Sequence, residues 1–305
     1  MRLEVSKSSL KRIETGTAWY CPSGGVNAGT VHTAASMPVD IKNMFFDGHG
    51  SLRKAPFMVD DPLCLTHPTK VRHNPDFKKK RNMLAAAEWW NVLPSFDGVL
   101  AGGMSLSFFM AAVNIKVVHA SSLALNYGLN FTYSERWPIL GFRATRALGI
   151  FSAIPALIFQ MLFGVGIILC KIPFISQKLL DIIYPPGAGP PDFLSRRGTC
   201  EVYSEVTAKA AAPTRNGNVD RAACHIRFQG DASNLVTSQV VCESALSLLH
   251  NRSELPPRSD DGFGTSAELV GKVLLKRLKE NKVRKVEIET KVQKDGPKVN
   301  LNLLV

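Results

Sequence analysis

The sequence predicts an α/β (α+β) protein, in which helices pack on a mixed, largely antiparallel sheet and an apolar helical insertion interrupts the fold. Three patterns support this prediction. Apolar and polar residues alternate over 200–206 and 224–229, which is the two-residue period of strands with one buried face. Apolar residues recur at helical spacing over 108–126 and 265–278. Between these regions, residues 147–170 contain no charged side chain.

The composition is that of a folded chain, and its charge narrows the range of partners. The chain has 305 residues, 45% of them hydrophobic, which is enough for one large domain or two small ones. A formal net charge of +12 fits a nucleic-acid-binding protein, a protein on an anionic membrane or an ordinary basic protein. The basic runs at 78–81 and 272–285 contain no aromatic residues for base stacking. We therefore expect a solvated face or a lipid-headgroup contact, and no nucleic-acid partner.

The cysteines argue against a metal centre. All six are at least 18 positions apart, so the sequence contains no CxxC motif. This spacing predicts neither a zinc site nor any other metal site. With no cleavable signal peptide recognised at 1–18, we expect free thiols in a reducing compartment.

Residues 23–37 begin with glycines that suit a tight turn, and they continue as a predicted helix from Val31. Two interpretations remain open for this segment. Either the amides at the start of the helix face an anion, or the segment is a plain strand-to-helix turn. The charged, proline-containing stretch 60–81 that follows is predicted to be a surface loop.

A helix is predicted over 108–126, with two different faces. The apolar face consists of residues at i, i+3 and i+4 spacing, namely Phe109, Ala112, Val113, Val117 and Ala120. Polar residues of the opposite face and the next tyrosine are the candidate site-lining residues: Asn114, Lys116, His119 and Tyr127. Lys116 and His119 suit an acidic group, although a lone histidine on such a helix is more often a plain surface or boundary residue.

Residues 147–170 are the feature around which the prediction is built. A helix of these 24 residues is about 36 Å long, enough to cross a hydrocarbon core of about 30 Å. The alternatives are a buried core helix and a segment that lies in the membrane interface, because Pro155 and three glycines weaken a continuous span. The side chains expected to contact lipid are Ala147, Leu148, Ile150, Phe151, Leu157, Phe159, Leu162, Phe163, Ile167, Ile168 and Leu169.

The insertion has a second part and a clear end. Residues 172–184 carry apolar side chains on one face, which predicts an amphipathic helix for a membrane interface or a core. The proline- and glycine-rich run 184–191 ends it. The predicted regions are an N-terminal remnant at 1–22, a first part of the α/β domain at 23–146, the membrane-associating insertion at 147–184 and a second part of the domain at 192–305.

The C-terminal region is predicted to alternate strands and helices. A helix over 234–250 follows the two strands named above. The capping box Thr265-Ser266-Ala267-Glu268 marks the start of a second helix. A further strand is predicted over 283–288, and a turn at Asp295-Gly296 is expected to return the chain into 299–303.

One stretch imitates a cofactor site. Residues 262–267 match the GxGxxA dinucleotide-binding pattern, and a helix is predicted to follow them. The preceding residues, 255–261, contain two prolines and three charges and cannot form the strand that this fingerprint requires. We therefore predict no cofactor-binding residue in this chain.

The order of several segments carries a resemblance that no single segment carries alone. The segments are 107–118, 126–133, the apolar stretch, 184–190, Gly230-Asp231 before Thr237, 243–246, Leu255-Pro256 and 262–267. In this order the chain, over about 23–288, resembles the later part of saccharopine dehydrogenase-like oxidoreductases. This branch includes the trans-acting enoyl reductases of glycolipid synthesis and animal proteins found at lipid droplets and mitochondria.

The resemblance implies a two-part oxidoreductase: a Rossmann domain for a nicotinamide cofactor, then an α/β domain with an apolar, membrane-seeking insertion. We expect the Rossmann domain to be missing or vestigial in this chain, so that NAD(P) binds only where such a domain is present. The chain departs from the family pattern at 230–234, at Thr265-Ser266-Ala267 and at His119. For this reason no catalytic residue is carried over.

The resemblance and the apolar segment together predict a cytosol-facing protein of the lipid droplet, endoplasmic reticulum or mitochondrion, with membrane lipid as its partner. Its expected function is that of an oxidoreductase linked to lipid or glycolipid metabolism, not competent to bind its cofactor alone. The alternative is a non-catalytic module that anchors to a membrane or lipid droplet or mediates an interaction.

Overall fold

The computed structural model describes most of the predicted α/β domain. The described residues are 12–36, 65, 84, 93–128, 130–169, 178, 181–182, 185, 187–209, 219–256 and 264–296. The predicted loop at 60–81 lies outside them apart from Leu65, and so does the predicted helix at 172–184 apart from three residues.

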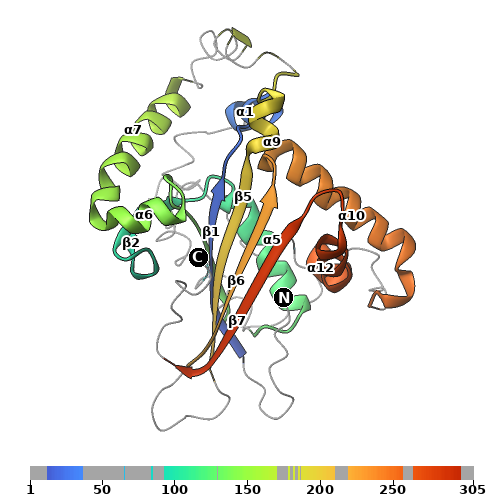
Figure 1. Ribbon diagram of the computed structural model, residues 1–305. Helices are drawn as coiled ribbons and strands as arrows, with labels where there is room; N and C mark the ends of the chain where they lie inside the picture. The colour runs from blue at the N-terminus through green and yellow to red at the C-terminus, as the bar shows by residue number, and fades with distance from the viewer. Residues whose placement is uncertain are drawn as a thin grey trace, which may run out of the picture.

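A seven-stranded mixed sheet forms the centre of the molecule (Figure 1). Its strands are β1 (Arg12–Pro22), β2 (Ser95–Asp97), β3 (Gly103–Ser107), β4 (Thr132–Trp137), β5 (Thr199–Lys209), β6 (Val219–Gln229) and β7 (Val286–Gly296). The strand order is β2-β3-β4-β1-β5-β6-β7. The pair β1 and β4 is parallel, and the other neighbouring pairs are antiparallel, as predicted.

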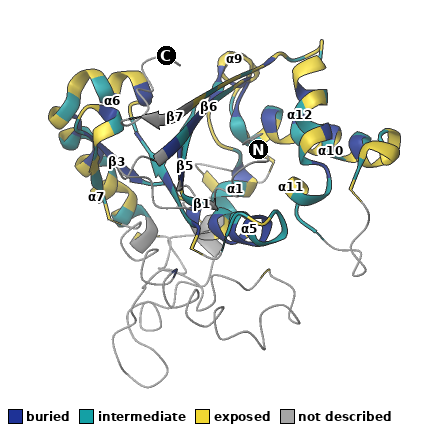
Figure 2. Cartoon of the chain, turned by 90° about the horizontal axis from the view of Figure 1, so that it is seen from below, coloured by how far each residue is buried: buried dark blue, intermediate teal, exposed yellow. Residues whose placement is uncertain are grey.

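Helices lie on both sides of this sheet. They are α1 (Ala28–Ser36), α5 (Ala111–Ala124), α6 (Phe142–Leu148), α7 (Ala153–Leu169), α9 (Asp192–Arg197), α10 (Thr237–His250), α11 (Ser266–Leu269) and α12 (Gly271–Glu280). Short helical turns are η1 (Gly98–Leu100), η2 (Gly149–Ser152), η3 (Ala232–Val236) and η4 (Arg252–Glu254). Helices α5, α10 and α12 lie on one side of the sheet and α6 lies on the other, whereas α7 packs beside the sheet edge at β3 (Figures 1 and 2).

Strand β1 occupies the middle of the sheet, between β4 and β5. Its residues alternate between the two layers, and Ala18 and Trp19, on opposite faces, are both buried. Residues 12–22, which the sequence assigned to an N-terminal remnant, are therefore joined to one sheet with strands from both parts of the α/β domain.

The core beneath α10 and α12 follows the predicted periodicities. Alternate residues of β5, β6 and β7 face the two helices, and the cluster consists of Cys200, Phe228, Val236, Leu278 and Val286. The N-cap half of the predicted capping box is confirmed, because Thr265 Oγ1 accepts a hydrogen bond from the Glu268 amide at 3.4 Å. The predicted apolar face of the following helix is also confirmed, since Val270, Val273 and Leu278 are buried.

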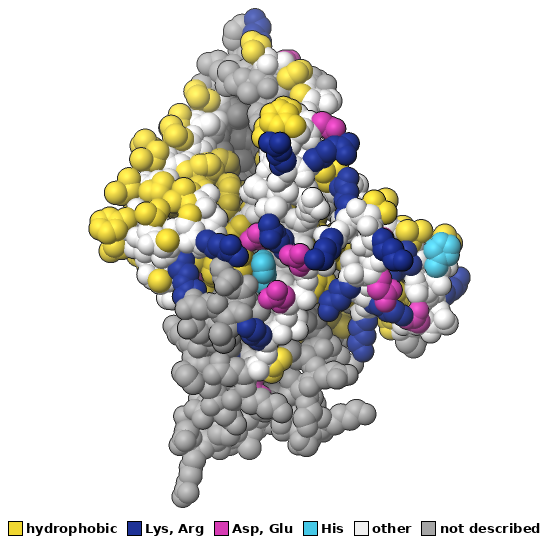
Figure 3. Space-filling view, viewed as in Figure 1, with side chains coloured by type: hydrophobic (Ala, Val, Ile, Leu, Met, Phe, Trp, Pro, Cys, Tyr) yellow, Lys and Arg dark blue, Asp and Glu magenta, His cyan; other side chains and the backbone are white. Residues whose placement is uncertain are grey.

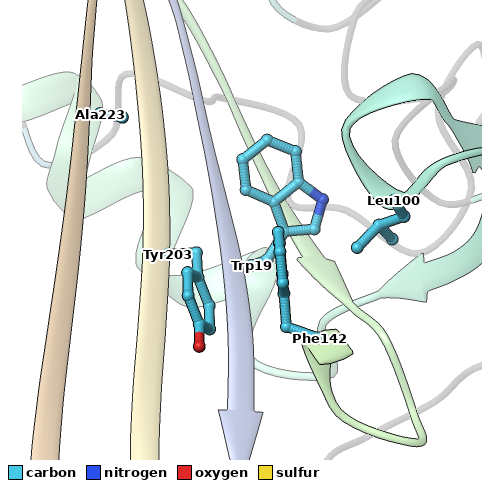
Figure 4. Packing of buried hydrophobic residues seen from close by; sticks show 5 residues of the cluster. All are labelled: Trp19, Leu100, Phe142, Tyr203 and Ala223. Atoms are coloured by element: carbon cyan, nitrogen blue, oxygen red, sulfur yellow. The ribbon is translucent and has the colours of Figure 1, made fainter. Parts of the chain in front are cut away.

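A second core lies on the opposite face of the sheet (Figure 4). The ring of Phe142, at the start of α6, stacks on Tyr203 of β5 with centroids 4.1 Å apart. It meets Trp19 of β1 edge to face at 6.3 Å, and Leu100 and Ala223 complete the cluster. These contacts attach α6 to the two central strands.

Two features of the C-terminal half differ from the sequence prediction. Strand β7 continues through Asp295 to Gly296, which pairs with Val219, so the predicted turn at these residues is wrong. Pairing with the long strand β6 keeps the dipeptide within β7, whose last residue is Gly296. The predicted strand 299–303 lies outside the described residues. The helix predicted over 234–250 is present, and it begins as the π-helical turn η3.

The aromatic core predicts a large difference between two phenylalanines that lie nine positions apart. Phe142→Ala removes a ring that is 2% exposed and is expected to lower the free energy of unfolding by about 3–5 kcal/mol. Phe151→Ala, at a side chain that is 69% exposed, is the matched control and should change it by about 0.5 kcal/mol or less. Urea denaturation of both variants measures the difference, and equal losses would contradict the packing described here.

Candidate functional site

The apolar segment forms two helices set at an angle, in contrast to the single helix predicted over 147–170 (Figure 1). Gly149 has φ of +53° and ψ of −129°, a conformation that favours glycine, and η2 follows it. Helix α7 has 17 residues and is about 26 Å long. Within the described chain, Phe142–Gly166 is nevertheless the one helical stretch that is long and apolar enough to cross a membrane.

One stripe of α7 packs on the edge of the sheet. Ala153, Ala156 and Phe159 contact the cluster that β3 contributes through Met104 and Leu106. The Met104 amide donates a hydrogen bond to Ser152 Oγ at 2.7 Å, just before α7 begins. The first half of α7 is therefore fixed to β3.

The rest of the segment is exposed. Of the 18 most apolar consecutive residues in Phe142–Gly166, only 11% are buried inside the protein. We use the term apolar surface for the large side chains of this segment that are at least 37% exposed, namely Leu148, Ile150, Phe151, Ile154, Leu157, Ile158, Met161, Leu162, Phe163, Val165 and Leu169. Hydrophobic side chains gather on this flank of the molecule (Figure 3). An exposed apolar patch of this kind marks an interaction site.

The structure places most of the residues that the sequence expected to contact lipid. Leu148, Ile150, Phe151, Leu157, Leu162, Phe163 and Leu169 belong to the apolar surface, and Ala147 is exposed beside them. Phe159 points inward and meets Trp137 edge to face at 5.2 Å. The side chains of Ile167 and Ile168 lie outside the described part of the chain.

A buried polar cluster lies between α5 and the sheet. Glu135 of β4 is fully buried, and its Oε2 accepts a hydrogen bond from Asn114 Nδ2 at 2.9 Å. The hydroxyls of Tyr20 and Tyr133 donate to its Oε1 at 3.2 and 3.1 Å. Burial raises the pKa of Glu135 above its ordinary value of 4.5, although the three hydrogen bonds act in the opposite direction. The cluster satisfies its own polar groups and fastens α5 to β1 and β4.

The four candidate site-lining residues do not form one pocket. Asn114 belongs to the Glu135 cluster. His119 and Tyr127 each meet Phe131 edge to face, with ring centroids 6.0 and 5.5 Å apart. Lys116 is buried on the same helix. These contacts give Asn114, His119 and Tyr127 a structural role beside α5.

The predicted faces of α5 are wrong at most positions, although Ala120 is buried as predicted. Phe109, Val113 and Val117, which were expected in the core, are exposed, whereas Lys116 and His119 are buried. The helix carries apolar residues all around it, so spacing alone could not identify its inner side. Glu135 was missed for a related reason. Residues two positions apart in a strand share a face, so Glu135 points to the same side of β4 as Tyr133 and Trp137. A carboxylate at such a position is nevertheless expected to face solvent.

The glycine-containing segment after β1 is a capped strand-to-helix turn. Asn27 Oδ1 accepts hydrogen bonds from the amide and the hydroxyl of Thr30, at 2.8 and 2.9 Å. The chain's own side chain thus occupies the start of α1, which favours the plain turn over the anion site. Gly24 has φ of +96°, and a Cβ atom there would lie 2.9 Å from Gly198 Cα.

Asp231 holds the neighbouring loops together. It is fully buried and accepts hydrogen bonds from the hydroxyl of Ser195 and the amide of Asn234, the latter at 2.7 Å. Although burial acts to raise it, these hydrogen bonds lower the pKa of Asp231 below its ordinary value of 3.8. The segment 230–234 is therefore a structural junction between α9, β6 and η3.

The described residues offer no metal-binding group of three His, Cys, Asp or Glu side chains. Cys21, Cys200, Cys224 and Cys242 are free thiols. The GxGxxA-like stretch lies only partly in the described chain, where Thr265 caps the one-turn helix α11. Comparison of the chain with protein-family models, with curated proteins and with solved structures finds no match.

The buried carboxyl group predicts a dependence of stability on pH. Because its pKa is raised on folding, the folded chain holds the Glu135 proton at pH values where the unfolded chain has lost it. Its contribution is therefore complete below about pH 4.5 and is lost as the pH rises through the folded pKa. Urea denaturation from pH 4 upward should show this fall in the free energy of unfolding, and Glu135→Gln should flatten it. An unchanged slope in the variant would contradict the assignment.

Proposed function

We propose that this protein binds the cytosolic face of a membrane or a lipid droplet through the apolar surface of α6, η2 and α7. The observation that carries the proposal is that these large apolar side chains are exposed, although the helix that bears most of them packs on the α/β domain. Transfer of a fully exposed Leu, Ile or Phe side chain out of water is favourable by roughly 1.5–3 kcal/mol. Eleven side chains, each exposed by about a third to two thirds, supply on the order of 10 kcal/mol.

The face of β5, β6 and β7 opposite α10 and α12 carries exposed charged side chains beyond the core formed with α6. Arg227, whose side chain is 48% exposed, lies between Glu201 and Glu287, at 3.3 and 4.0 Å. Charged side chains of both signs cover this face, next to the apolar flank (Figure 3). Such cross-strand pairs belong in water, because burying charges in hydrocarbon is costly. The two surfaces together favour a protein that lies at a lipid boundary.

Substitution in α7 tests the proposed lipid contact. The triple variant Ile158→Gln, Met161→Gln and Leu162→Gln changes side chains that make up the exposed side of the helix. Losing about half of the roughly 1.5–3 kcal/mol transfer free energy at each position should weaken vesicle binding by at least about tenfold. Flotation of the full chain with vesicles of phosphatidylcholine and phosphatidylserine measures the change.

Helix α10 supplies a matched control. Val241, Leu248 and Leu249 are also at least half exposed, so their replacement by glutamine removes a similar apolar area from another helix. This variant should float like the unchanged protein. Equal losses in both variants, or no loss in the α7 variant, would contradict a lipid contact through α7.

The second candidate function is that of a saccharopine dehydrogenase-like oxidoreductase in lipid or glycolipid metabolism. What supports it is that segments carrying the resemblance lie together. Ser121 of α5, which lies between the segments 107–118 and 126–133, is hydrogen-bonded to Thr265 of the segment 262–267, at 2.8 Å. In this proposal the Rossmann half is missing or vestigial in the chain, and NAD(P) binding requires that half. Without it, the protein is a non-catalytic lipid-binding module.

Cofactor binding by the chain alone tests this second candidate. No glycine fingerprint follows a predicted strand in the sequence, so nothing is expected to cradle the pyrophosphate. Titration of the purified full chain with NADPH, followed by nucleotide fluorescence, should show no saturable binding at micromolar concentrations. Saturable micromolar binding would overturn the proposal that the Rossmann half is missing, and it would leave the lipid contact untouched.

A further inference from the structure

We infer that the apolar surface enters a single leaflet of an anionic phospholipid membrane, with α7 lying in the membrane plane and Arg143 and Arg146 of α6 at the lipid phosphates. This inference rests on the proposed function and adds the orientation of the helix and the class of lipid. Four features of the structure lead to it: the sheet edge beside α7, the dimensions of α7, the apolar side of α7 opposite the sheet and the charges of α6.

The sheet edge argues against a helix that crosses the bilayer. Helix α7 packs on β3, and Ala156 at this contact is almost completely buried. Strand β2 follows β3 and forms the edge of the described sheet. A crossing by α7 would carry this open edge into hydrocarbon, where unpaired backbone groups find no hydrogen-bond partners. The side of α7 that faces β3 must therefore stay out of the lipid.

The dimensions of α7 lead to the same orientation. Its length of about 26 Å, from 17 residues, falls short of a hydrocarbon core of about 30 Å. The break at Gly149 prevents α6 from extending it, and Phe142 holds α6 in the core beside Tyr203. A helix that lies in the plane needs no matching length, because it inserts only one side into the headgroup and acyl boundary.

The side of α7 opposite the sheet is uniformly apolar. On a helix of 3.6 residues per turn, Ala156, Phe159 and Phe163 share one side, and Ile154, Met161 and Val165 share the other. Ala156 and Phe159 belong to the packed stripe, and Phe163 stacks on Phe159 while remaining 47% exposed, whereas Ile154, Met161 and Val165 are 62%, 64% and 49% exposed. This separation into a protein side and a lipid side is the pattern expected of an in-plane helix.

The cations of α6 specify the lipid. Arg143 is exposed and Arg146 is half-buried, and they lie three positions apart, on neighbouring positions of one helix face. Neither forms an ion pair with any residue that the structure describes. Ile150 and Phe151, 65% and 69% exposed, follow directly. A guanidinium group binds phosphate in a bidentate manner, so arginines beside inserted Ile and Phe side chains fit an anionic headgroup layer.

Vesicle flotation with two lipid compositions tests the lipid class. The unchanged full chain should bind phosphatidylcholine vesicles weakly and vesicles that also contain phosphatidylserine strongly. Because each cation near an anionic surface contributes about fivefold, Arg143→Gln with Arg146→Gln should weaken binding to the mixed vesicles roughly 30-fold. Binding to pure phosphatidylcholine should stay unchanged. The control Lys272→Gln with Lys279→Gln removes two exposed charges from α12 and should have no effect on either.

The outcomes separate this inference from the proposed function. Equal binding to both compositions, or equal losses in the α6 and α12 variants, would overturn the phosphate contact and leave lipid binding through α7 intact. Absence of binding to either composition by the unchanged protein would overturn both.

Fluorescence quenching tests the orientation. Tryptophan is introduced singly by Ile154→Trp, Met161→Trp or Val165→Trp, and the increment over the unchanged protein is measured in vesicles with lipids brominated at different depths. The first and last positions are about 16 Å apart along the axis of α7. We expect the same shallow bromine position to quench all three most strongly. A progressive change of depth from Ile154 to Val165 would show a crossing helix and overturn the inference.

Discussion

Trp19 and Tyr20, neighbours on the central strand β1, hold opposite layers of the molecule. Trp19 meets Phe142 of α6 on one face of the sheet and donates a hydrogen bond to Asp97 at 2.8 Å. Tyr20 stacks on Phe108 on the other face and donates to Glu135. Because adjacent residues of a strand point to opposite sides, one strand fixes both the segment that leads to the lipid contact and the helix α5. The position of α7 therefore depends on a strand far from it in sequence.

The parts of the fold that the sequence predicted are those whose burial follows a simple period. Strands β5 and β6 alternate over 200–206 and 224–229, and the face with Cys200 and Phe228 is the one beneath α10 and α12, although Tyr203 on the other face is buried as well. Thr265 caps α11, and α12 carries a regular apolar stripe. The orientation of α5 was not predictable in this way, because Phe109 and Val113 satisfy the same spacing as the true inner face. Glu135 shows the same limit, since its partner Tyr20 lies 115 positions away. A buried carboxylate becomes intelligible only when long-range partners are in place.

The apolar segment was predictable in character and not in shape. Its lack of charge led to the prediction of which residues contact lipid, and most of these residues are exposed. The break at Gly149 and the packing of Ala156 on β3 depend on the sheet, which no local pattern reports. The same packing converts a segment with the composition of a membrane span into a helix with a packed side and an exposed side, the one proposed to contact lipid. Hydropathy measures the average over both sides.

The exposed side of α7 also affects how copies of the protein interact in water, away from the proposed lipid contact. In water, the eleven partly exposed side chains of the apolar surface form a site at which copies of the chain associate with one another. Self-association and docking on lipid thus compete for the same atoms. The formal charge of +12 works against the first process, because like-charged copies repel, and in favour of the second wherever the bilayer is anionic. The net positive charge of the chain thereby opposes self-association as long as the apolar surface is uncovered.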